Sequence, residues 1–245
     1  MSDPIRVAFV VEGPTDFIIL RAIVERLLKG NDFVPQVLQP EISDAFKITP
    51  GDDGGWPGIY RWCRQAADQG GGNLDGDFLF TVHDLLIFQI DADVAGTTYA
   101  AGHIKNPIPG ASLPCEEKCP PASTTTNNLR NIVSVWLGGN PLPQQVVMCI
   151  PSKALETWVL IGMFPSDAAV VKGDIECRDK PGHTLRSKPK EKRLISGNKK
   201  IIEKYEEFAR RIAEQWSVIR EKCTEARRFE TELSRALTVE REKAD

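Results

Sequence analysis

Two short apolar runs constrain the fold of this chain more than any other feature of its sequence. They cover residues 5–12 and 85–91, are rich in Val, Ile, Leu and Phe, and do not alternate regularly with polar residues. Such runs are typical of strands that are buried on both faces of a parallel sheet. Open α/β sheets bind their ligands beyond the carboxyl ends of the strands, so acidic side chains at these ends are candidate site residues. The acidic residues at the two ends are Glu12, Asp16, Asp91 and Asp93.

The remaining segments predict an alternation of strands and helices. Further strands are expected at residues 33–38 and 145–150, and helices at residues 16–28, 56–67, 127–137 and 153–163. This order favours an α/β fold with a mostly parallel sheet, flanked by helices, over residues 1–175. Pro and Gly are frequent in residues 95–126, which predicts an irregular insertion that is either a lid over the site or a surface addition.

Charge is divided unevenly along the chain. Residues 178–245 contain 19 Lys and Arg against 13 Asp and Glu, whereas residues 1–177 contain 12 against 21. Residues 176–245 are therefore expected to form a basic loop and helical region beside an acidic domain. This division is typical of a metal-dependent enzyme that acts on a polyanion such as nucleic acid. Basic residues on exposed helices are also common as solvated faces, and the sequence leaves that alternative open.

The sequence favours a cytoplasmic protein that does not enter a membrane. No apolar stretch reaches the roughly 20 residues that cross a bilayer, and the first strand is expected too close to the N-terminus for a signal peptide. Of the six cysteines, Cys115 and Cys119 lie close together in the Pro-rich segment. A zinc site would need further ligands, for which Cys177 and His183 are the distant candidates. Solvated or redox-active thiols are the other interpretation.

Two motifs in the first half of the chain resemble those of the TOPRIM family. Residues 11–16 (Val-Glu-Gly-Pro-Thr-Asp) resemble its Glu-Gly-x-x-Asp/Glu motif, and residues 90–93 (Ile-Asp-Ala-Asp) resemble its Asp-x-Asp motif. In that family each motif ends a parallel strand. The resemblance covers residues 5–165 and implies a TOPRIM-like, Rossmann-like fold that binds Mg²⁺ or Mn²⁺.

Two later segments resemble OLD-like nucleases and small standalone TOPRIM proteins. Residues 150–158 contain Ser152 and Glu156, which the resemblance places near a second metal ion, although three residues separate them here and one in the OLD pattern. Residues 188–194 resemble a basic segment that supplies a catalytic lysine, for which Lys190 is the candidate. Many small TOPRIM proteins of this kind are found in bacterial anti-phage systems, which implies an effector role in such a system.

The expected activity is metal-dependent hydrolysis of phosphodiester bonds in DNA, or alternatively in RNA. Glu12 is a candidate general base, and Lys190 a candidate for offsetting charge in the transition state. Simpler roles stay open, because Asp16 and Glu156 also suit helix N-termini and Ser152 suits an N-cap. The expected ligands of the Mg²⁺ or Mn²⁺ ions are Glu12, Asp16, Asp91, Asp93, Ser152 and Glu156.

The sequence also leaves two other functions open. The fold can serve as a scaffold or binding subunit, in which case the helical residues 199–243 would contact a partner or a second copy of the chain. An RNA maturase resembling RNase M5 would have a similar acidic site. The chain has no Walker motif, so any ATPase or regulatory partner would be a separate protein.

Overall fold

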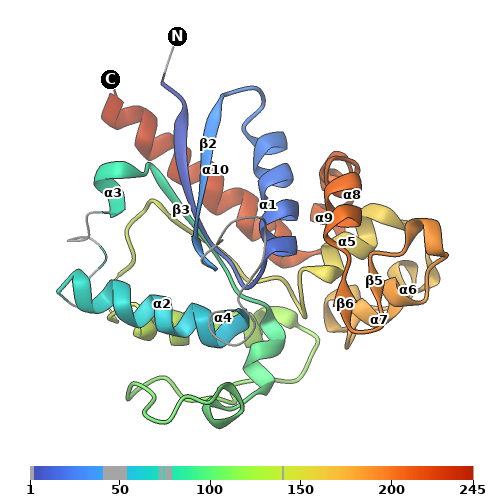
Figure 1. Cartoon of the computed structure of the whole chain (residues 1–245), viewed down its shortest axis with the longest axis horizontal. Helices are drawn as coiled ribbons and strands as arrows, with labels where there is room; N and C mark the ends of the chain where they lie inside the picture. Colours follow the sequence, from blue (N-terminus) through green and yellow to red (C-terminus); the bar gives the residue numbers. More distant parts are fainter. Residues whose placement is uncertain (1–2, 41–53, 72–73, 75–78, 140, 245) are drawn as a thin grey trace.

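A four-stranded parallel sheet forms the centre of the molecule (Figure 1). The computed structural model describes residues 3–40, 54–71, 74, 79–139 and 141–244. The strands lie in the order β2-β1-β3-β4, and each pairing is parallel. Their bounds are β1 Ile5–Val10, β2 Phe33–Gln39, β3 Leu85–Gln89 and β4 Val146–Cys149. The α/β class and the parallel sheet predicted from the apolar runs are confirmed.

The two central strands are the two that the sequence identified most clearly. All five residues of β3 and the last four of β1 are buried, as expected for continuous apolar runs inside a parallel sheet. Val7 pairs with Leu85 across β1 and β3, and Phe88 pairs with Met148 across β3 and β4. Because these strands run in the same direction, the segments that follow them all leave the sheet at one edge.

Helices cover both faces of the sheet and give the molecule three layers (Figure 1). The helices are α1 Pro14–Leu27, α2 Gly55–Gln69, α3 Leu79–Val82, α4 Ala122–Trp136, α5 Glu156–Met163, α6 Ala168–Val171, α7 Pro181–Arg186, α8 Ile202–Glu214, α9 Trp216–Lys222 and α10 Thr224–Ala244. Val7 and Ile87 face the layer that contains α1, α5, α8 and α10. Ala8 and Phe88 face the opposite layer, which contains α2 and α4. No helix in the described part of the chain is long and apolar enough to cross a membrane.

The basic C-terminal region shares its core with the sheet domain. Helices α5 and α8 pack closely at Gly162. A Cβ atom added to this residue would lie only 2.9 Å from Cγ2 of Ile212. Trp158 of α5 packs against Trp216 of α9, with ring centroids 5.4 Å apart. The apolar face of residues 199–243, which the sequence also offered as a surface for a partner, is therefore used largely for packing within the chain.

The Pro-rich insertion is fixed to the C-terminal region by a disulfide. Residues 103–121 form no helix or strand, and α4 begins at Ala122, directly after Pro121, which is earlier than the sequence predicted. Cys119 is bonded to Cys177, at the end of the 3₁₀ helix η4 (Ile175–Cys177). The zinc interpretation of these two cysteines is therefore wrong, because a disulfide sulfur is not a thiolate ligand. Cys115 carries a free thiol.

Candidate active site

Five acidic side chains that the sequence predicted as site residues meet beyond the carboxyl ends of β1, β3 and β4. Glu12 and Asp91 follow β1 and β3, and Asp16 lies in the first turn of α1. Asp93 lies in the 3₁₀ helix η2 (Ala92–Gly96), and Glu156 is the first residue of α5. The charges of these carboxylates act on one another. The arrangement follows from the parallel sheet, which brings three strand ends to the same edge.

Gln89 holds Glu12 and Asp91 together, a role that no sequence pattern indicated. Its carboxamide donates to Oδ1 of Asp91 at 2.8 Å and accepts from the backbone N–H of Glu12 at 3.0 Å. Asp91 also accepts from the N–H of Leu155 at 3.0 Å, and its own N–H donates to Oε1 of Glu12 at 2.7 Å. Gln89 is fully buried. These bonds fix the two carboxylates relative to the ends of β1, β3 and α5.

Asp16 and Glu156 are joined by a lysine that the sequence analysis did not select. The Nζ atom of Lys200 lies 3.2 Å from Oδ1 of Asp16 and 2.6 Å from Oε1 of Glu156. The hydroxyl of Tyr205 donates to the same Glu156 oxygen at 3.2 Å. The side chains of Asp16 and Glu156 are only 5% and 7% exposed, whereas that of Lys200 is 35% exposed. Lys200 therefore brings a positive charge from the molecular surface to two buried carboxylates.

Two of the predicted site residues lie apart from these contacts. The hydroxyl of Ser152 is buried and donates to the backbone oxygen of Glu176 at 2.7 Å. The N-cap of α5 is Leu155, so Ser152 does not cap that helix either. Lys190 is exposed in the 3₁₀ helix η5 (Lys190–Lys192), and no described hydrogen bond or ion pair joins it to the carboxylates.

Burial and crowding of negative charge disturb the acid–base properties of the cluster. Burial, together with the charges of Asp16 and Asp93, raises the pKa of Glu12 from 4.5 to about 8. Burial and the neighbouring Glu12 raise the pKa of Asp91 well above its ordinary value. Burial by itself would lower the pKa of Lys200, but the charges of Asp16 and Glu156 outweigh it and raise that pKa. Without a cation, Glu12 and Asp91 therefore tend to hold protons near neutral pH, because ionising all five acids would leave more negative charge than Lys200 compensates.

The chemistry of the donor set suits a hard divalent cation. Glu12, Asp91 and Asp93 offer only oxygen atoms, which Mg²⁺ and Mn²⁺ prefer. In the described hydrogen bonds Glu12 and Asp91 each use a single carboxylate oxygen as acceptor, Oε1 and Oδ1. No three His, Cys, Asp or Glu side chains in the described residues are arranged as a formed metal site. Binding a cation here would therefore require these side chains to turn toward it.

The Pro-rich insertion lies beside the cluster. The backbone N–H groups of Cys115 and Glu116 donate to the carbonyl of Ala95, at 2.8 and 3.0 Å, in the helix that carries Asp93. Lys153 forms ion pairs with Glu116 and with Asp179, the latter at 3.4 Å. The insertion is thus held at the border of the candidate site by the disulfide and by a charged contact.

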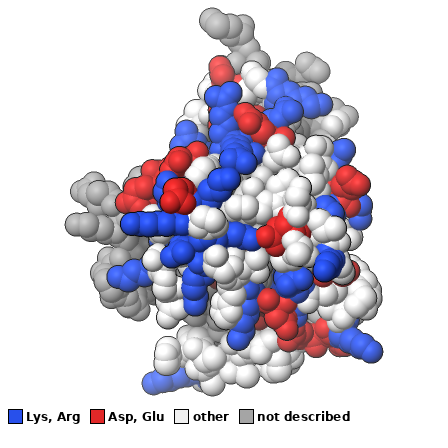
Figure 2. All heavy atoms as spheres, turned by 90° about the vertical axis from the view of Figure 1, so that its right-hand side faces the viewer, with Lys and Arg blue, Asp and Glu red and all other residues white. Residues whose placement is uncertain are grey.

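Basic side chains gather on the neighbouring surface, formed by the segment from α7 to α8 (Figure 2). This segment includes the short strands β5 Ile195–Ser196 and β6 Lys199–Lys200. Lys190, Lys192, Lys199 and Arg210 are exposed there. Lys200, which contacts Asp16 and Glu156, belongs to the same segment.

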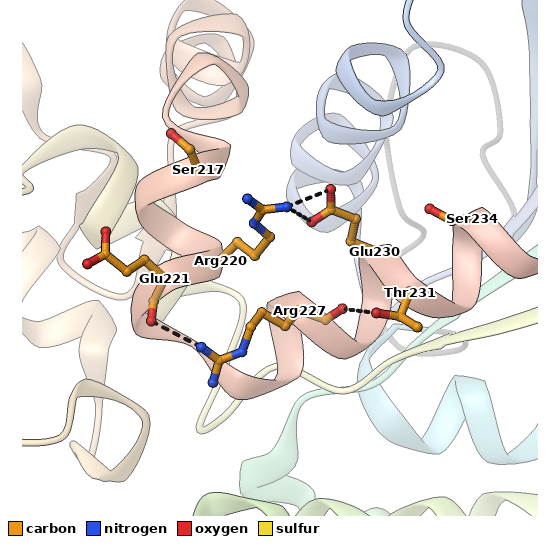
Figure 3. A pocket seen from close by; sticks show the side chains of 7 residues that line it. All are labelled: Ser217, Arg220, Glu221, Arg227, Glu230, Thr231 and Ser234. Atoms are coloured by element: carbon orange, nitrogen blue, oxygen red, sulfur yellow. Dashed lines mark hydrogen bonds and ion pairs between the residues drawn. The ribbon is translucent and has the colours of Figure 1, made fainter.

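A separate hollow of about 720 Å³ lies between α9 and α10 (Figure 3). The Nη1 atom of Arg220 already donates to both carboxylate oxygens of Glu230, at 3.2 and 3.1 Å. Arg227 donates to the backbone oxygen of Glu221 at 3.4 Å. Since two arginines and two glutamates line the hollow, its formal charge cancels. The residues that line it are Ser217, Arg220, Glu221, Arg227, Glu230, Thr231 and Ser234.

Comparisons of the chain with protein families, with curated proteins and with solved structures found no match.

Proposed function

We propose that this protein is a divalent-metal-dependent nuclease that hydrolyses phosphodiester bonds in DNA. The observation that carries the proposal is the excess of carboxylates at the carboxyl edge of the sheet, where Lys200 pairs with only two of the five acidic side chains. Gathered carboxylates with raised pKa values are typical of functional sites. The adjoining basic surface suits the phosphate backbone of nucleic acid (Figure 2).

In this proposal Glu12, Asp91 and Asp93 hold Mg²⁺ or Mn²⁺, and Gln89 and the N–H of Leu155 orient Asp91. The cation, when bound, supplies electrostatic stabilisation of the charge that develops on the phosphate. In the alternative that the sequence offered, Glu12 instead acts as general base toward a water molecule, and Asp91 and Asp93 hold the cation. Lys200, in place of the Lys190 that the sequence suggested, supplies the positive charge that offsets negative charge in the transition state.

The test is an assay of the purified protein on plasmid DNA and on RNA, with Mg²⁺ or Mn²⁺ and with EDTA. We expect metal-dependent cleavage of DNA, reduced at least about 100-fold by Asp91→Asn. The Asn Oδ1 atom can still accept from Gln89 and Leu155, so the variant should fold. Asp68→Asn is the matched control, because Asp68 is 74% exposed on α2.

Each alternative result of this assay has a clear meaning. Cleavage retained by Asp91→Asn would contradict the assignment of the site. Preference for structured RNA would favour the maturase alternative. Absence of cleavage on every substrate would favour a scaffold role or a requirement for a separate partner, and the effector role in defence rests on the resemblance alone.

A further inference from the structure

Asp16 and Glu156 form a binding position for a cation (the seat), and the ammonium group of Lys200 occupies it. They belong to different helices, α1 and α5, yet both direct an oxygen to Nζ of Lys200, at 3.2 and 2.6 Å. Both side chains are more than nine-tenths buried. Two buried carboxylates this close repel each other unless a positive charge lies between them. The ammonium group of Lys200 supplies that charge.

The backbone on both sides of Lys200 holds it in this position. Lys200 ends the antiparallel pair β5–β6, in which Ser196 pairs with Lys199. The next N–H, of Ile201, donates to the carbonyl of the buried Leu194 at 2.8 Å. Neighbouring strand residues point to opposite sides, and of the two lysines of β6 it is Lys200 whose ammonium contacts the carboxylates. The position of the ammonium is thus set by the fold.

We infer that Lys200 takes the place of a second divalent cation, so that the proposed active site binds one metal ion per chain, at Glu12, Asp91 and Asp93. The inference rests on the proposed function. A Mg²⁺ ion bound to the same oxygens would lie about 2.1 Å from them. It would therefore stand within a few ångströms of the ammonium, and the two positive charges would repel each other. Lys200 has to leave before a metal ion can use Asp16 and Glu156.

The test is the number of Mn²⁺ ions bound per chain, measured by calorimetric titration and by the electron paramagnetic resonance signal of free Mn²⁺. The wild-type protein should bind one ion, and Asp91→Asn should lose it. Lys200→Ala should bind two, because the emptied seat admits a second cation. The double variant Lys200→Ala/Asp16→Asn should return to one ion.

Two controls separate charge from structure. Lys200→Arg keeps the positive charge and should bind one ion, as should Lys199→Ala, which removes the exposed neighbour. Circular dichroism establishes that each variant is folded before titration. Two ions in the wild-type protein, or one in folded Lys200→Ala, would overturn the inference and leave the nuclease proposal intact. No bound ion in the wild-type protein, with no cleavage, would overturn both.

Discussion

The carboxylate cluster and the ion-pair network around Arg130 both bury acidic side chains, but they balance the charge differently. Arg130, on α4, contacts Glu225 at 3.4 Å and Glu232 at 3.0 Å, and its side chain is only 9% exposed. Glu225 also accepts from the hydroxyl of Thr126 at 2.8 Å. Glu232 accepts from the N–H of Met148 at 3.1 Å. Arg228 also pairs with Glu232, at 3.1 Å, so two arginines face two glutamates, although the Nε atom of Arg130 has no hydrogen-bond partner among the described residues. The network joins α10 to α4 and β4.

At the carboxyl edge of the sheet the chain supplies too little positive charge. Lys200 pairs with Asp16 and Glu156, and burial leaves Glu12 and Asp91 with raised pKa values. A network whose charges are paired internally stabilises one arrangement of the fold. A cluster with an excess of one charge instead requires protons or an external cation, which is the property that a metal site needs. The contrast therefore distinguishes the cluster that we propose to be functional from one that stabilises the fold.

The largest effect on stability is expected from breaking the balanced network. Arg130→Met should lower the free energy of unfolding by about 3–5 kcal/mol, because it leaves the buried carboxylate of Glu225 without a positive charge beside it. Urea titration of the metal-free protein measures this change. Arg210→Met is the control, since Arg210 is 92% exposed and pairs only with Glu214 among the described residues, and it should cost less than about 0.5 kcal/mol. Near-wild-type stability of Arg130→Met would show that the network is not structural.

The disulfide gives the next effect. Cys177→Ser should lower the free energy of unfolding by about 2–4 kcal/mol, because Cys119 and Cys177 close a loop across a sequence separation of 58 residues. Thermal unfolding with and without a dithiol reductant measures it. Reduction should destabilise the wild-type protein to the same extent and leave the variant unchanged. An equal response of both proteins to the reductant would contradict the pairing.

The pH dependence of the stability of the metal-free protein tests the carboxylate cluster. The pKa of Glu12 is about 8 in the folded protein, against 4.5 for a free glutamate side chain, so the folded state binds the extra proton between these values. Its stabilising contribution is complete below about pH 4.5 and is lost as the pH rises through 8. We expect a loss on the order of 1–3 kcal/mol from pH 5 to pH 8, reduced from the full shift because the residue is partly exposed.

Glu12→Gln should flatten this pH profile, whereas a saturating concentration of Mn²⁺ should restore stability at pH 8 by occupying the ionised cluster. Unfolding by urea at each pH measures both effects. A metal-free profile that rises between pH 5 and pH 8 would contradict the raised pKa of Glu12.

The smallest effect is expected at the basic surface. Lys190→Ala should change the rate of cleavage less than about twofold at moderate salt, because an exposed charge in water interacts weakly with the cluster. Lys200→Ala should change it more strongly, since its ammonium contacts Asp16 and Glu156. Initial rates on plasmid DNA at two salt concentrations measure both. A larger loss for Lys190→Ala would return the catalytic lysine to the segment that the sequence suggested.

The sequence by itself determined the central strands and the acidic residues at their ends. Continuous apolar runs indicate strands buried on both faces, and parallel strands end at one edge, so local pattern was sufficient to place Glu12 and Asp91 together. The helices that follow were also predicted, although the start of α4 shifted to Ala122 because the Pro-rich stretch ends before it.

Only the tertiary structure selected Lys200, Gln89 and the pairing of Cys119 with Cys177. Lys190 and Lys200 occupy similar basic, polar stretches of sequence, and nothing local distinguishes them. Lys200 reaches Asp16 across 184 residues, a contact that exists only after α8 and the β5–β6 pair have packed against α1 and α5. Sequence pattern records which side chains lie near a strand end, whereas the partner that completes the site is decided by how distant segments pack.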